Sequence, residues 1–120
     1  SNLSGEYKDK VCCIVGARGE LVRKDKPTVA ALVRSIAQAS AYVAENPNES
    51  AKLFARYSPK VPIEDLRALL GTLTHNHHPL GKNLRDEVEF YARDFRSVGV
   101  LKKTTDPVRF AEHVSFDPLA

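Results

Sequence analysis

The chain has 120 residues, 42% of them hydrophobic and 28% charged, which fits one folded domain rather than a disordered tail. The formal net charge is only +3 and the two signs alternate along the sequence, which argues against nucleic acid as the main partner. No stretch approaches the roughly 20 apolar residues of a membrane span, so the sequence predicts no transmembrane helix.

The start of the sequence and its two cysteines bear on whether the chain is a fragment and on the compartment in which it works. The chain starts at Ser1 and contains no methionine, so we expect residues 1–120 to be a single domain or a fragment of a longer protein. The only cysteines, Cys12 and Cys13, are neighbours. A disulfide between neighbours is strained, so the two cysteines leave the redox compartment undecided.

The first regular element predicted is a short buried strand over Val11–Val15. These five small or branched apolar residues follow Lys10 and precede Gly16, and unbroken hydrophobicity is typical of a strand covered on both faces. A single strand cannot satisfy its own backbone groups, and only the short stretches Leu21–Val22 and Val114–Phe116 offer partners within the chain. We therefore expect this strand to pair with a second copy of the chain or with a sheet in a larger protein.

The rest of the sequence predicts helices. Residues 18–24 fit either a helical turn or a continuation of the strand. Beyond them, apolar residues recur at helical spacing in four stretches, and a short fifth helix follows. Prolines suit the first turn of a helix and Gly99 suits the end of the fourth, which gives boundaries near 27–46, 47–58, 62–74, 80–99 and 107–114. The fold class is thus mainly α with one short buried strand.

Three histidines form the most conspicuous chemical cluster: His75, His77 and His78, in a predicted loop over 74–79. Imidazoles are common metal ligands, but zinc needs further donors, and Cys12 and Cys13 are expected to be buried. We therefore predict no metal or cofactor and keep the three histidines only as weak candidates for ligand binding. Because no catalytic motif is present, we expect no enzymatic activity.

The order of these pieces resembles a known family. The stretch Glu45-Asn46-Pro47-Asn48-Glu49 followed by Ala51-Lys52-Leu53, and the later stretch from Tyr91 to Leu101 with its glycine stop, are similar to the C-terminal part of bacterial ABC-transporter substrate-binding proteins of the nitrate, sulfonate and taurine kind. The similarity runs from about Val11 to Phe116. No single motif in it is as specific as a metal signature, so the ordered set carries the resemblance.

The resemblance implies a periplasmic protein, or one anchored on the outer face of the cytoplasmic membrane. It would hold a small-molecule solute in a cleft between two α/β lobes and deliver it to the permease of the transporter. This chain would be the C-terminal segment of one lobe, with its strand inserted in a sheet formed by earlier sequence. No ligand contacts are carried over, because the family's contacts come mostly from segments that precede Ser1. The alternative is a helical interaction module that forms a homodimer through the strand Val11–Val15.

Overall fold

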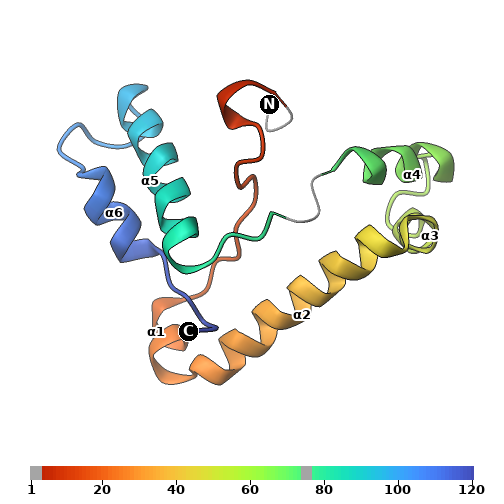
Figure 1. Cartoon of the computed structure of the whole chain (residues 1–120), viewed down its shortest axis with the longest axis horizontal. Helices are drawn as coiled ribbons and strands as arrows, with labels where there is room; N and C mark the ends of the chain where they lie inside the picture. The colour runs from red at the N-terminus through yellow and green to blue at the C-terminus, as the bar shows by residue number, and fades with distance from the viewer. Residues whose placement is uncertain (1–3, 74–76) are drawn as a thin grey trace. The chain divides into compact units, whose positions relative to one another are not determined.

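The computed structural model describes residues 4–73 and 77–120, and within them the chain is all α (Figure 1). The elements in chain order are the 3-10 turn η1 (Gly5–Tyr7), α1 (Gly19–Lys24), α2 (Lys26–Glu45), α3 (Pro47–Ala55), α4 (Ile63–Thr72), α5 (Gly81–Ser97) and α6 (Pro107–Val114). The chain divides into two units, one made of Ser1–Ala30 and His78–Ala120 and the other of Ala31–His77. None of the helices described is both long and apolar enough to cross a membrane.

The helix boundaries follow the local signals in the sequence. Pro47 and Pro107 occupy the first turns of α3 and α6, where a missing N–H costs no hydrogen bond. Gly99 ends α5 with a φ of 81°, and the Leu101 N–H donates to the Phe95 carbonyl at 3.0 Å. The predicted helices and the glycine stop are therefore confirmed, and residues 18–24 take the helical alternative as α1.

In the first unit, α6 packs against α5 through small side chains (Figure 1). Ala92 of α5 and Ala111 of α6 are fully buried, and Pro107 is buried at the start of α6. Gly81 begins α5 with a φ of 54°, and a Cβ there would lie 2.7 Å from a carboxylate oxygen of Asp117. A side chain at this position would therefore strain the backbone and push the Asp117 carboxylate aside.

In the second unit, α3 packs against α4, and its buried residues are few. Ala51 is fully buried and Leu66 is 4% exposed, as their helical spacing predicts. Spacing of three residues places Phe54 and Tyr57 on the same predicted buried stripe as Ala51. That prediction is wrong for these two residues, because they are 50% and 83% exposed. Two short helices in contact cover only one face of each other, and no other described helix of this unit packs on the remaining apolar side chains.

The predicted buried strand is also corrected. Residues 11–18 have no regular secondary structure, and four of the five residues from Val11 to Val15 are exposed. The two stretches considered as partners, Leu21–Val22 and Val114–Phe116, lie mainly in α1 and at the end of α6. A strand requires a neighbour to accept and donate its backbone hydrogen bonds, and the described part of the chain supplies none.

The cap of α6 yields a prediction about stability. The Asp106 Oδ1 atom accepts hydrogen bonds from the backbone N–H groups of Val108 and Arg109 at 2.9 and 3.1 Å, and these bonds lower the pKa of Asp106. Asp106→Ala should lower the thermal midpoint by roughly 2–6 °C, whereas Asp106→Asn, which can still cap, should lower it less. A lowered pKa means that the cap stabilises the fold above the ordinary Asp pKa of 3.8 and weakens as pH falls through the folded value. Melting followed by circular dichroism measures both effects, and equal midpoints for Asp106→Ala and the unaltered chain would contradict the role of the cap.

Candidate interaction surface

The apolar segment, defined as Val11–Val15, combines exposed apolar side chains with backbone groups that lack hydrogen bonds within the described structure. Ile14 is 66% exposed and Val15 is 49% exposed, although both have high preference for strands. Among residues 4–73 and 77–120, no hydrogen bond joins the backbone of residues 12–17 to the rest of the chain. The segment therefore presents both apolar side chains and open backbone groups to whatever lies beside it.

The first residue of the apolar segment and the residues just before it attach the segment to α5. The Val11 N–H donates to Glu87 Oε2 at 2.5 Å, and the Lys10 ammonium lies 5.2 Å from the centre of the Phe90 ring. The Tyr7 hydroxyl donates to Asp94 Oδ2 at 2.6 Å. Because these partners recur along α5 at 87, 90 and 94, one face of that helix holds the N-terminal segment.

An aromatic cluster forms the centre of this attachment. The Tyr7 ring lies 5.6 Å from Phe90 in an edge arrangement and 6.0 Å from Tyr91 in a stacked one, and Tyr91 lies 6.2 Å from Phe95. Sequence reasoning missed this cluster because it predicted no element before Val11 and assigned no contact to Tyr7. The available signal was one aromatic residue in a polar stretch together with adjacent aromatics on an amphipathic helix.

The attachment of Tyr7 predicts a measurable titration. The hydrogen bond to Asp94, with partial burial and the nearby negative charge, raises the pKa of Tyr7 to about 12. A raised pKa means that the bond stabilises the fold fully below the ordinary value of 10.0 and is lost as pH rises toward 12. In an ultraviolet titration, Tyr7→Phe should remove the component that ionises near pH 12. Loss of a component that titrates near 10 instead would contradict the hydrogen bond.

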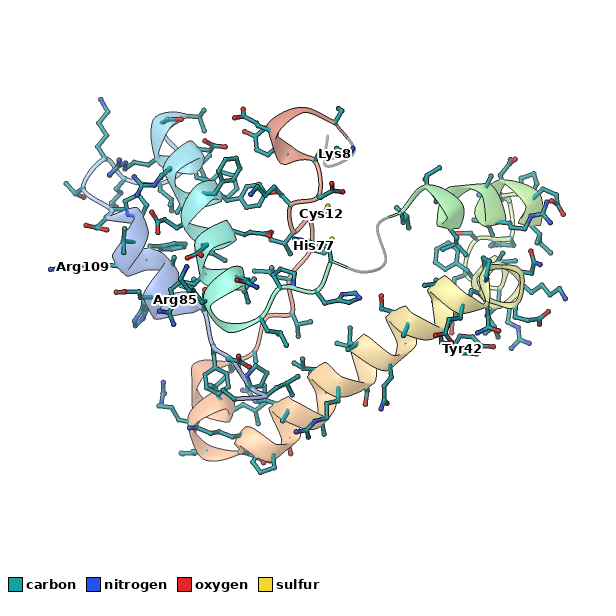
Figure 2. All side chains as sticks on the ribbon, in the orientation of Figure 1. Lys8, Cys12, Tyr42, His77, Arg85 and Arg109 are labelled. Atoms are coloured by element: carbon teal, nitrogen blue, oxygen red, sulfur yellow. The ribbon has the colours of Figure 1, made fainter. Side chains whose placement is uncertain are left out.

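Both cysteines of the apolar segment are exposed, and Cys12 is labelled in Figure 2. Both are free thiols, and their sulfur atoms are 4.0 Å apart. The expectation that they are buried is therefore wrong, since the covering sheet on which it rested is absent from the described residues. The hydrogen bond and the charge of the neighbouring Cys13 raise the pKa of Cys12.

The structure describes two of the three histidine candidates. His75 lies outside the described residues, while His77 is half-buried and His78 is exposed on the segment that leads to α5. The loop predicted over 74–79 is confirmed for its described residues, which have no regular secondary structure. Among the residues described, no group of three or more histidine, cysteine, aspartate or glutamate side chains is arranged to hold a metal ion. Their part in ligand binding stays a prediction.

A shallow groove lies between α3 and α4. Its volume is about 310 Å³, and its lining residues are Asn48, Glu49, Lys52, Ile63, Glu64 and Arg67. Lys52 pairs with Glu49 at 2.7 Å and Arg67 pairs with Glu64 at 2.5 Å. Because each cation already has a carboxylate beside it, the groove has no net charge with which to attract an ion.

Comparisons with known proteins give no relative to set beside this geometry. No protein-family model matches the chain. The searches of curated proteins and of solved structures find no match either. Inferences about function therefore rest on the sequence and on the contacts described above.

Proposed function

We propose that the chain is the C-terminal part of the solute-binding component of an ABC transport system of the nitrate, sulfonate and taurine kind. In this proposal the apolar segment Val11–Val15 is a strand of an α/β lobe whose other strands come from sequence outside residues 1–120. The complete protein binds a small-molecule solute in a cleft, delivers it to the permease, and acts in the periplasm or on the outer face of the cytoplasmic membrane.

The observation that carries the proposal is the unpaired state of the apolar segment. Its residues are not helical, four of the five are exposed, and residues 12–15 form no backbone hydrogen bonds with other described residues. Backbone groups without hydrogen bonds, next to exposed apolar side chains, favour pairing with another strand. Pairing gives the backbone groups hydrogen bonds and buries the apolar side chains. A sheet in the same protein would supply that strand at no cost in association entropy.

The exposed faces of the helices support the proposal further. Among the described residues, no large side chain is fully buried, and most of the core consists of alanine and valine. Many large apolar side chains remain exposed in the second unit: Leu32, Ile36, Tyr42, Leu53, Phe54, Tyr57, Val61, Ile63, Leu69 and Leu73. Faces of this kind are expected for helices that cover a sheet, since the sheet buries the apolar stripe of each helix.

The experiment that tests the proposal starts from the gene. The coding sequence before Ser1 should encode an export signal or lipoprotein start and then an α/β lobe. The complete product should be released with the periplasmic or membrane-anchored fraction, and calorimetric titration with nitrate, a short sulfonate and taurine should detect binding of one class. A gene product that consists of residues 1–120 alone would overturn the proposal.

A second candidate function rests on the same segment. A helical interaction module would pair two copies of the apolar segment across a twofold axis. Sedimentation of the chain at micromolar concentration separates the candidates. A dimer that dissociates in Ile14→Asp favours the module, whereas a monomer in both forms removes its basis.

A further inference from the structure

The adjacent thiols of Cys12 and Cys13 offer a second chemistry on the apolar segment. Both side chains are exposed and neither forms a disulfide. Side chains of successive residues in a regular strand point to opposite faces, but here the two sulfur atoms approach to 4.0 Å. The unpaired backbone therefore allows both thiols to reach one bound atom from the same side.

The distance between the sulfurs fits bridging by a third atom better than direct oxidation. Two thiolates bound to one tetrahedral metal at about 2.3 Å are about 3.8 Å apart, which is close to the observed separation. A disulfide requires a separation of about 2.05 Å, and the α-carbons of neighbouring residues, about 3.8 Å apart, are closer than ordinary disulfides allow. Little movement is needed to bridge the pair, whereas oxidation strains the backbone.

The number of ligands near the two thiols decides which kind of metal or metalloid atom the pair can bind. Within the part of the chain that the structure describes, no third histidine, cysteine or carboxylate completes a metal-binding group with the two thiols. Zinc requires four ligands and so is poorly served by two. A trivalent organoarsenical keeps one carbon substituent and needs only two sulfur ligands, so the pair supplies its full requirement.

We propose that Cys12 and Cys13 form a vicinal dithiol site that captures trivalent arsenicals of the R–As=O class. Each thiol forms one As–S bond, the As=O bond breaks, and the oxygen leaves with the two thiol protons as one molecule of water. Arsenic stays trivalent, so the step needs no oxidant or reductant. Capture closes a ring through the Cys12–Cys13 peptide unit and holds both side chains on one side, which a regular strand excludes. The site rests on the irregular conformation of the apolar segment and not on the proposed transport function, and pairing of residues 11–15 in a sheet would remove it.

The test uses the complete chain and phenylarsine oxide, with intact mass as the readout. One adduct per chain is expected, at the mass of the reagent less one water. The adduct should survive an excess of a monothiol and be removed by a small dithiol. Cys12→Ser and Cys13→Ser should each retain the arsenical more weakly against the monothiol by on the order of a hundredfold, because the second bond is lost.

A matched variant separates geometry from the number of thiols. Cys13→Ser combined with Val15→Cys keeps two exposed thiols on the same segment but no longer as neighbours. The inference expects this variant to lose the arsenical to a monothiol faster than the unaltered chain does. Equal retention by the matched variant, or by either single-cysteine variant, would overturn the site. Circular dichroism confirms that each variant keeps its helices.

Discussion

The backbone amides of residues 12–15 are expected to exchange with deuterium within seconds in this chain and far more slowly in the complete transport protein. In the chain they lack hydrogen-bond acceptors among the described residues. In a sheet their exchange would require opening of the lobe, which slows it by on the order of a thousandfold or more. Hydrogen exchange read by mass spectrometry measures the difference, with the buried α5 residue Ala92 as an internal reference that is slow in both proteins.

The same prediction can be tested by the effect of one substitution on folding stability. Ile14→Asp should leave the melting midpoint of the chain unchanged, because the side chain is already 66% exposed. In the complete protein the same change should destabilise the lobe by about 3 kcal/mol or more, since it buries an unpaired charge. Slow exchange of residues 12–15 in the monomeric chain would contradict the unpaired state. Fast exchange in the complete protein would contradict insertion into a sheet.

Ala51→Asp is expected to separate α3 from α4. Ala51 is fully buried, so an aspartate there places a charge between the helices without a partner and costs about 3 kcal/mol or more. Ala68→Asp is the matched control, because Ala68 lies in the same helix pair but is exposed. Urea unfolding followed by circular dichroism compares the two variants.

A milder variant keeps the second prediction testable if Ala51→Asp does not fold. Ala51→Leu adds volume without charge and should cost about 1–3 kcal/mol through overpacking. The expected order of stability is Ala68→Asp, then Ala51→Leu, then Ala51→Asp. Equal stability for Ala51→Asp and Ala68→Asp would show that the contact between α3 and α4 does not depend on the small residue.

The histidine-bearing loop and the adjacent cysteines mark where sequence reasoning reached its limit. Spacing places His75, His77 and His78 close together in the chain, but metal binding depends on donors that converge from other segments. No pattern within one segment reports such convergence. The attachment of Tyr7 to Asp94 and of Val11 to Glu87 was missed for the same reason, since each contact joins residues that are far apart in sequence.

The helices could be predicted from the sequence because their causes are local. Prolines at the starts of α3 and α6, the Asp106 cap and the glycine after α5 act within a few residues of the boundary that they set. Which apolar residues are buried was decided by tertiary contacts. Ala51 and Phe54 lie on the same predicted stripe of α3, yet one is fully buried and the other is half exposed.

The apolar segment also shows which features follow from local sequence and which depend on tertiary contacts. Its composition by itself indicated that Val11–Val15 is not helical, because branched side chains disfavour the helix. Composition could not determine whether the segment is a strand, because strand formation is a property of two segments and the hydrogen bonds between them. Only the tertiary structure decided that no strand among the described residues pairs with it and that its two thiols are exposed.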